Sequence, residues 1–393
     1  MKYLSHFWGI AAALLLQASS VSADSIYAPS PVPLLTVSVR SDALIVPVTI
    51  AGKQYSFLLD TGAAMMVIDN RLASDITSKT PDDLLPALAK KILSTGINTS
   101  GGMLKGELIR FWQPLALAIG NEVVPASDPW VGADLSAFTQ NSGMQIDGII
   151  GQDLYRQFNW AVDNRNHQLT VWKHPLTVRN YQACVPYRDA WDFGPELMLD
   201  YHDRPLYMAL NTGAAWSTIG EEIVHASRGH FGSAILTGIT QPVITLNGIE
   251  RSDAYLLGGI QFDRLPLGKL LAIEDKRGNY GLGMNFLQRF DDYLLAPDKM
   301  LLCYNQQHFT RDEAAPLRTL AVRYFARRVE IYANSPGALS SSVLHNGDVL
   351  LQINGSKVLP EKMEWIRGTL ADTPLGELNL RIERRGKVRN VTL

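Results

Sequence analysis

From residue 35 onward the chain alternates short apolar runs with polar turns, a pattern typical of a mostly β protein. The segment 71–91 contains Leu, Ala and Lys, and prolines at 81 and 86 divide it into short helix and loop. Alternation and β-branched content predict early strands at 35–39, 44–50, 55–59, 115–119, 123–124 and 169–172.

One of these apolar runs is interrupted by an acid. Residues 57–69 read FLLDTGAAMMVID, so Asp60 stands between two apolar stretches. Burying a carboxylate there costs on the order of several kcal/mol unless it is hydrogen-bonded or used. Gly62 fits a tight turn that needs unusual backbone angles. We therefore expect a turn that presents Asp60 at the floor of a cleft.

A second stretch echoes the first. Residues 206–219 read LYMALNTGAAWSTI, in which an apolar strand leads into Asn211-Thr212-Gly213 and then into Ala-Ala and another apolar run. An Asp-Thr-Gly tripeptide alone arises by chance, so the echo gives the first turn its weight. The aspartate of the first turn is an asparagine in the second.

A longer internal repeat accompanies the two turns. Residues 283–304 align with residues 151–172 without a gap, and glycine, phenylalanine and aromatic positions coincide. The interval between turn and glycine is shorter in the second copy. We interpret the repeat as two homologous β-rich lobes, 33–175 and 176–306.

These features resemble the aspartic peptidases, in which two Asp-Thr/Ser-Gly turns meet at the floor of one cleft. The run Ile149-Ile150-Gly151 after the first turn is a second mark of that family. Ala63, directly after the first turn, looks more like the retroviral-type branch, while two lobes in one chain resemble pepsin-like enzymes. The Gly- and Ser-rich segment 95–104 is either the hairpin flap of such an enzyme or a plain surface loop.

The resemblance implies roles for both turns. In the family two carboxylates share a proton; the ionised one takes a proton from water and the other polarises the peptide carbonyl. The threonines would brace the turns through hydrogen bonds between the lobes. The predicted catalytic-site residues are Asp60, Thr61, Gly62, Asn211, Thr212 and Gly213.

Asn211 changes this chemistry, because an amide exchanges no proton at ordinary pH. The pKa of Asp60 should be lower than in a true dyad, and loss of a partner acid typically costs about 10²–10⁴ in rate. Three interpretations remain open. In the first, the protein is a weak or unusual endopeptidase, which recruits another acid or pairs the Asp60 turns of two chains. In the second, it is a catalytically silent relative that binds peptide as inhibitor, chaperone-like factor or scaffold. In the third, it is a β scaffold with a degenerate cleft.

The C-terminal segment differs in composition. Residues 307–316 have the polar composition of a linker, and 317–393 carry the runs NSPGA at 334–338 and NGDVLLQING at 346–355. This order resembles bacterial PDZ domains, small α+β domains that bind peptide by strand addition, here along 320–325. The usual glycine-containing loop is absent from 314–320, so capture of a C-terminal carboxylate is not expected. The basic residues Arg384, Arg385, Lys387 and Arg389 are interpreted as a solvated hairpin face.

Composition and motif spacing argue against several other classes of function. The net charge of −2 argues against a nucleic-acid partner. No phosphate loop or metal-spaced cluster is present, so no cofactor or metal is expected. Ser217 lacks a G-x-S-x-G elbow, and His202, His225 and His230 lack ligand spacing. Polypeptide, bound in the cleft and in the PDZ groove, is the expected partner; the oligomeric state stays open.

The first 23 residues predict export. Lys2, an apolar stretch over 9–16 and Val21-Ser22-Ala23 form a signal-peptide pattern, and no later run is long or apolar enough for stable membrane insertion. We expect a periplasmic or secreted protein. In such a compartment Cys184 and Cys303 either form a disulfide or remain two unrelated thiols, and the sequence leaves both open.

Overall fold

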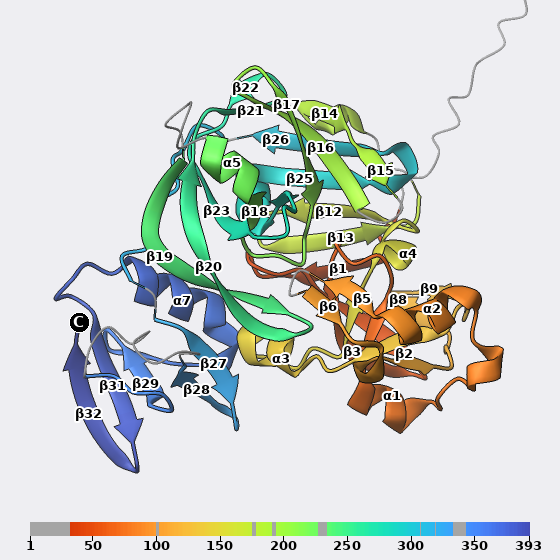
Figure 1. Cartoon of the computed structure of the whole chain (residues 1–393), viewed down its shortest axis with the longest axis horizontal. Coiled ribbons are helices and arrows are strands. Elements are labelled where there is room, and N and C mark those ends of the chain that lie inside the picture. Colours follow the sequence, from red (N-terminus) through yellow and green to blue (C-terminus); the bar gives the residue numbers. More distant parts are fainter. Residues whose placement is uncertain are drawn as a thin grey trace, which may run out of the picture. The chain divides into compact units, whose positions relative to one another are not determined.

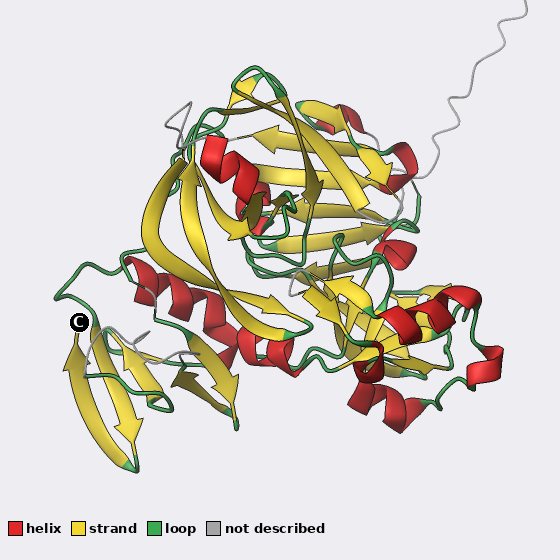
Figure 2. Ribbon diagram, in the orientation of Figure 1, coloured by secondary structure: helices red, strands yellow, loops and turns green. Residues whose placement is uncertain are grey.

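The computed structural model describes residues 32–99, 102–174, 178–190, 194–226, 234–306, 308–318, 320–332 and 343–393. The expected signal peptide, His230 and the run at 334–338 lie outside these residues. Strands dominate and the helices are short, which confirms the prediction of a mostly β protein (Figure 2). Residues 33–393 belong to one unit.

The first sheet contains the strand that leads into Asp60. Its eight strands lie in the order β7-β10-β4-β11-β3-β2-β8-β9. β11 runs parallel to β3 and sets Ile149 beside Leu58 and Ile150 beside Leu59. The apolar pair thus supports the strand that ends at the turn. The strands are β2 (Ile45–Ile50), β3 (Lys53–Leu59), β4 (Val67–Asp69), β7 (Arg110–Trp112), β8 (Leu117–Ile119), β9 (Glu122–Val124), β10 (Trp130–Ala133) and β11 (Gly148–Ile150).

The second sheet repeats that order around the Asn211 turn. From β20 onward it reads β20-β23-β18-β24-β17-β16-β21-β22, with β19 added outside β20 and β15 paired to β16. The parallel pairs recur as well, since β24 joins β17 and β23 joins β18 as β11 joins β3 and β10 joins β4. The strands are β15 (Arg188–Ala190), β16 (Gly194–Tyr201), β17 (Pro205–Leu210), β18 (Ser217–Gly220), β19 (Ala234–Thr245), β20 (Gly248–Leu257), β21 (Ile260–Phe262), β22 (Leu265–Pro266), β23 (Leu270–Asp275) and β24 (Gly281–Leu282).

A third sheet joins the two halves of the repeat. It has six strands in the order β1-β13-β12-β25-β26-β14. Its central antiparallel pair sets Trp160 opposite Leu295 and Asp163 opposite Asp292, so the two copies of the aligned segment pair with each other. The strands are β1 (Leu35–Ser38), β12 (Asn159–Asp163), β13 (Gln168–Trp172), β14 (Ala183–Pro186), β25 (Phe290–Ala296) and β26 (Leu301–Gln306).

The same sheet decides the question left open for the cysteines. Cys184 on β14 lies directly opposite Cys303 on β26, and the two form a disulfide. The bond ties the outermost strand of the sheet to its neighbour. It spans 119 residues of sequence.

Short helices and one small hairpin lie between the strands of residues 33–306 (Figure 1). The segment 95–104, left open between a hairpin and a plain loop, contains the antiparallel strands β5 (Ile97–Thr99) and β6 (Gly102–Leu104). The segment 71–91, expected to be short helix and loop, contains two short helices, and the second of them continues to Thr95. The helices are α1 (Asn70–Ile76), α2 (Ala87–Thr95), α3 (Ser136–Ser142), α4 (Gln152–Tyr155), α5 (Glu221–Ala226) and α6 (Met284–Leu287), with 3-10 turns η1 (Asp82–Leu84), η2 (Gly106–Leu108), η3 (Val178–Asn180) and η5 (Pro297–Lys299).

The C-terminal residues build a separate small sheet and core. The sheet order is β27-β28-β29-β31-β32 with β30 beside β29, and α7 packs Met363, Ile366 and Leu370 into the core. Its elements are β27 (Val322–Phe325), β28 (Arg328–Ile331), β29 (Val349–Ile353), β30 (Ser356–Lys357), η6 (Pro360–Lys362), α7 (Met363–Asp372), β31 (Asn379–Arg384) and β32 (Lys387–Thr392).

One basic residue of this region differs from expectation. Arg384 is not part of a solvated face: its Nη2 lies 2.6 Å from Oδ2 of Asp348, which is 1% exposed. The pair closes the Gly-Asp turn against β31. A buried acid has to be paired, whereas the sequence pattern showed only the excess of basic residues.

The segment after β26 is held against the second sheet. Phe309 is buried, and Glu313 accepts a hydrogen bond from the Leu271 amide and pairs with Arg289 at 3.2 Å. The described part of the predicted linker is therefore anchored at Phe309 and Glu313, while most of its other residues are exposed. It fixes where the C-terminal segment begins.

Candidate active site

The Asp60 and Asn211 turns have the same local geometry. β3 ends at Leu59, and the amide of Gly62 donates to Oδ1 of Asp60 at 2.8 Å. β17 ends at Leu210, and the amide of Gly213 donates to Oδ1 of Asn211 at 2.9 Å. In both turns a short polar side chain caps the backbone two residues further on, as Asp and Asn commonly do.

The two threonines bind the turns to each other. The Thr61 amide donates to the Thr212 hydroxyl and the Thr212 amide to the Thr61 hydroxyl, both at 3.1 Å. The Thr61 hydroxyl donates to Leu210 O at 2.5 Å and that of Thr212 to Leu59 O at 2.8 Å. Both threonines are fully buried, so every one of these bonds is shielded from water.

The glycines let the side chains of the two turns approach. A Cβ on Gly62 would lie 2.6 Å from Nδ2 of Asn211, and a Cβ on Gly213 would lie 2.5 Å from Oδ2 of Asp60. Such distances are too short for any side chain. Each glycine thus leaves room for the functional group of the opposite turn, and this brings Asp60 and Asn211 to one place.

A second layer supports both turns in the same way. The backbone N–H of Gln152 donates to the carbonyl oxygen of Ala63, and the backbone N–H of Met284 donates to that of Ala214, each at 2.8 Å. Gly151 and Gly283 lie so close to the backbones of Met65 and Trp216 that a side chain would clash. The glycines shared by the internal repeat therefore have a packing reason.

The carboxyl of Asp60 is a weaker acid than an ordinary aspartate. Burial raises its pKa to about 6, although hydrogen bonds from the amides of Gly62, Ala63 and Gly213 act in the opposite direction. Because Asn211 is uncharged, the rise comes from desolvation and not from a like-charged partner. At neutral pH the group is largely ionised, and it gains a proton in mildly acid solution.

The orientation of the Asn211 amide follows from its hydrogen bond. Its oxygen accepts from the Gly213 amide, so the other end, Nδ2, presents N–H donors. Nδ2 faces Gly62 in the first turn. Asn211 therefore presents a neutral hydrogen-bond donor to the first turn.

Both residues line a cleft of about 1890 Å³. Small-molecule pockets are typically about 300–1,000 Å³, so the cleft suits a longer ligand. Ile97 and Leu104 of the β5–β6 hairpin also line it, and the Arg277 guanidinium donates to Thr99 O from the opposite side. Its walls are largely apolar, formed by Ile45, Leu58, Met65, Val67, Val131, Phe138 and Ile149 on one part and by Val243, Ile244, Leu246, Ile249, Leu271 and Ile273 on the other.

Residues 46–154 match the model of the aspartyl protease family. The matched segment contains the Asp60 turn and the Ile149-Ile150-Gly151 run, and it ends before Asn211. No match was found among curated proteins. An aspartyl protease domain thus supplies one of the two turns that meet in the cleft, and its family acts on polypeptides.

Ser217 and His225, which the sequence did not assign to a site, have ordinary structural or surface contacts. Ser217 is buried and donates to Asn285 Oδ1 at 2.9 Å. His225 pairs with Glu221 on the surface, and the described residues contain no His, Cys, Asp or Glu group suited to a metal ion. No helix in the described part of the chain has both the length and the apolar character needed to cross a membrane.

Sequence reasoning missed a polar cluster that also lines the cleft. Arg40, Asp42, Asn141, Glu364 and Arg367 all line the cavity and come from three distant segments. Nothing in the local pattern of any one segment marks it as a site. The only available signal was the Arg-Ser-Asp run at 40–42, directly before a predicted strand.

Proposed function

We propose that this protein is an exported aspartic-type endopeptidase in which Asp60 alone supplies the titrating carboxyl. The reciprocal hydrogen bonds of Thr61 and Thr212 carry the proposal, because they hold Asp60 and Asn211 together at the floor of a polypeptide-sized cleft. The aspartyl protease match and the repeated strand order support two peptidase lobes, 33–175 and 176–306.

One carboxyl is sufficient for a balanced reaction. Ionised Asp60 takes a proton from water while the water oxygen attacks the peptide carbonyl carbon. The Asn211 Nδ2–H stabilises the resulting oxyanion by a hydrogen bond. Asp60 then returns its proton to the leaving nitrogen as the C–N bond breaks, which yields a carboxylic acid and an amine. Asp60 acts first as base and then as acid.

The acidity of Asp60 fits this cycle. A group whose pKa is about 6 serves as a base at neutral pH and holds the proton strongly enough to pass it on. The expected activity rises with pH through about 6. The rate is lower than with two acids, by about 10²–10⁴, since no second acid polarises the carbonyl.

A second candidate function is supported by Asn211 itself. The cleft, the braces and the donor at Nδ2 are all suited to binding a peptide without cleaving it. Such a silent relative would act as inhibitor, chaperone-like factor or scaffold. The two candidates differ in the consequence of removing Asp60, which abolishes cleavage in the first and leaves binding intact in the second.

The segment 317–393 is proposed to be a PDZ domain that recruits polypeptide. β27 is the end strand of its sheet, and an end strand offers unpaired backbone groups to an extended chain. Val322 of β27 and Trp365 and Gly368 of α7 line the same cavity as Asp60. This continuity supports a role in binding the substrate.

Export to the periplasm or outside the cell is proposed from the N-terminal pattern. Lys2, the apolar stretch over 9–16 and the small residues at 21–23 support it. The Cys184–Cys303 disulfide gives weak additional support for an oxidising compartment.

The proposal is tested with a pool of diverse unstructured peptides at pH 7, incubated with the mature protein and with its Asp60→Asn variant. We expect cleavage by the first and none by the second. Equal cleavage by both would assign the activity to another group or a contaminant. Binding without cleavage by both would favour the silent candidate.

A further inference from the structure

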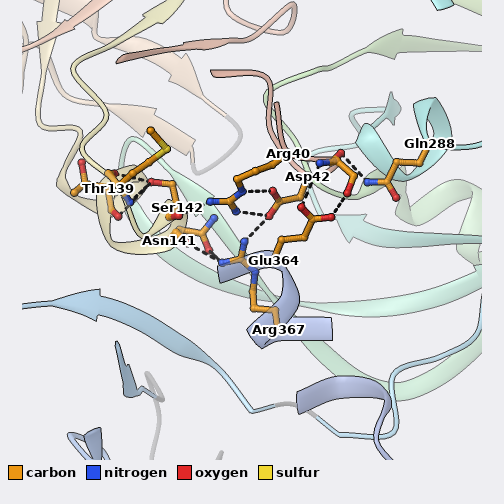
Figure 3. Close-up of polar contacts among 10 residues, drawn as sticks. Arg40, Asp42, Thr139, Asn141, Ser142, Gln288, Glu364 and Arg367 are labelled. Atoms are coloured by element: carbon orange, nitrogen blue, oxygen red, sulfur yellow. Dashed lines mark hydrogen bonds and ion pairs between the residues drawn. The ribbon is translucent and has the colours of Figure 1, made fainter. Parts of the chain in front are cut away.

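A charged cluster joins the C-terminal segment to the first part of the chain (Figure 3). Asp42 lies at its centre: Arg40 binds it with two hydrogen bonds of 2.8 Å, and Arg367 of α7 binds it at 2.5 Å. Arg367 also donates to Asn141 O at 2.7 Å. Three segments distant in sequence thus meet through two guanidinium groups and one carboxylate, with Glu364 alongside.

The cluster is shielded from solvent. The side chains of Arg40 and Asp42 are each 17% exposed and that of Arg367 is 26% exposed. Burial alone would raise the pKa of Asp42, but the positive charges of Arg367 and Arg40 hold it below its usual value. Buried ion pairs add little net stability, yet they penalise any arrangement that leaves one partner unpaired. The cluster therefore favours one docked orientation of α7.

Further contacts extend this interface on both sides. Glu364 accepts hydrogen bonds from the amide and the hydroxyl of Ser41, whose carbonyl accepts from Gln288 at 2.7 Å. A Cβ on Gly143 would lie 2.1 Å from the Pro360 carbonyl oxygen, so the chain after α3 passes directly against η6. The docking surface is specific in shape as well as in charge.

Docking places α3 against the predicted peptide groove. α3 contacts both β27 and α7. Phe138 and Asn141 of α3 line the cavity together with Val322 of β27 and Trp365 of α7. The space beside β27 therefore has a wall from the protease domain, in addition to the strand and helix of the C-terminal segment.

One helical glycine keeps this space open. Gly368 lies in the interior of α7, where glycine is less favourable than alanine. Apart from its chain neighbours and the backbone of α7 itself, no described atom lies within 4 Å of the position that its Cβ would take, so packing does not require a glycine. Gly368 lines the cavity, and its missing side chain leaves room for the backbone of a ligand.

We propose that the groove is a composite polypeptide site, completed only when the Asp42 cluster docks the C-terminal segment so that α3 forms its third wall. This inference rests on the proposed polypeptide-binding cleft. The occupant is an extended polypeptide that adds to β27 and continues along the same cavity toward Asp60. Docking and peptide binding are then linked, so that each strengthens the other.

The linkage is tested by peptide affinity in the full-length protein with Asp60→Asn as a non-cleaving background. The probe is a fluorescent, unstructured peptide of alternating apolar and polar residues. Asp42→Asn and Arg367→Gln should each weaken binding at least about fivefold, the lower end of typical couplings. The double variant should lose less than the product of the two effects. Asp128→Asn, at an exposed loop position, is the control and should bind as the background does.

Opposite results would overturn the inference. Unchanged affinity would mean that docking is irrelevant to the groove, and tighter binding in Asp42→Asn would mean that α3 blocks the groove instead of completing it. Absence of binding to the background protein would also contradict the inference. Cleavage by the Asp60 protein is scored separately, so the proposed function can stand when the composite site fails.

Gly368→Ala separates binding from folding. The change should raise the thermal midpoint, because alanine favours a helix, yet weaken peptide binding by a factor of five or more, about 1 kcal/mol. A variant that is both more stable and unimpaired in binding would show that no ligand backbone approaches α7 at this point.

Discussion

Thr61 and Thr212 exchange hydrogen bonds, each donating its backbone amide to the hydroxyl of the other at 3.1 Å. Each hydroxyl also donates to the strand that leads into the opposite turn. This relationship joins residues 151 positions apart in sequence. It fixes where Asp60 and Asn211 stand before any ligand arrives.

Replacing one of these hydroxyls should destabilise the fold. Thr61→Val keeps the shape of the side chain but leaves the Thr212 amide buried without its acceptor. The expected loss is about 1–3 kcal/mol in the free energy of unfolding, measured by denaturant titration. Thr36→Val, which removes an exposed hydroxyl pair, is the control and should stay within about 0.5 kcal/mol. Equal effects of the two changes would mean that the braces add no stability.

Asp60 should make stability depend on pH. Its folded pKa is about 6 against an ordinary 3.8, so the folded state binds the proton more tightly than the unfolded chain. Well below pH 3.8 both states are protonated and there is no penalty. As pH rises to about 6 the folded protein loses stability, and above that the loss stays constant. Asp60→Asn escapes this loss.

The size of the effect follows from the shift. It corresponds to at most about 3 kcal/mol, and we expect about 1–2 kcal/mol because the carboxyl borders the open cleft. Thermal melts should show Asp60→Asn above the unmodified protein at pH 7.5 and equal to it at pH 3, below the unfolded pKa. Asp128→Asn should show no such difference. A variant that gains equally at both pH values would place the cause elsewhere.

Asn211→Asp should convert the site into a two-carboxyl pair. With Gly62 and Gly213 allowing close approach, two carboxylates cannot both ionise easily, and they would share one proton. We expect the pH of maximal cleavage to move below 6 and the rate there to rise by about 10²-fold or more. Asn211→Ala should lower activity at every pH. An unchanged pH profile for Asn211→Asp would indicate that residue 211 does not face the reacting groups.

The disulfide should contribute strongly to stability. Its closed loop spans 119 residues, which corresponds to about 4–5 kcal/mol in the chain-entropy model. Reductant should lower the denaturation midpoint of the native protein and leave that of a Cys184→Ser, Cys303→Ser variant unchanged. The same midpoint with and without reductant in the native protein would contradict this assignment.

The sequence pattern predicted those features that neighbouring residues determine, namely the strands and the Asp60 turn. Alternation located most strands near the first turn to within a few residues, and the apolar-acid-glycine pattern located the Asp60 turn, because neighbouring residues dictate both. The internal repeat foreshadowed the pairing of β12 with β25. The sequence did not show whether Cys184 and Cys303 form a disulfide, because the bond depends on the pairing of β14 with β26 in the third sheet.

Ion pairs between residues distant in sequence could not be predicted from the sequence. Asp42 and Arg367 are 325 positions apart, and each is an ordinary charged residue in its own segment. Arg384 likewise reads as a surface residue until Asp348 is buried beneath it. Such pairs are chosen by the packing of whole segments, so neither spacing nor composition reveals them.

The central claim is that a single carboxyl, Asp60, performs both proton transfers. Its most direct test is the pH profile of kcat/KM for one peptide cleaved by the mature protein, followed from pH 3 to 8 beside Asp60→Asn. We predict a single rise with a midpoint near 6, a plateau above it, and no activity in the variant. A bell-shaped profile with an acid optimum, or activity that survives in Asp60→Asn, would contradict the account.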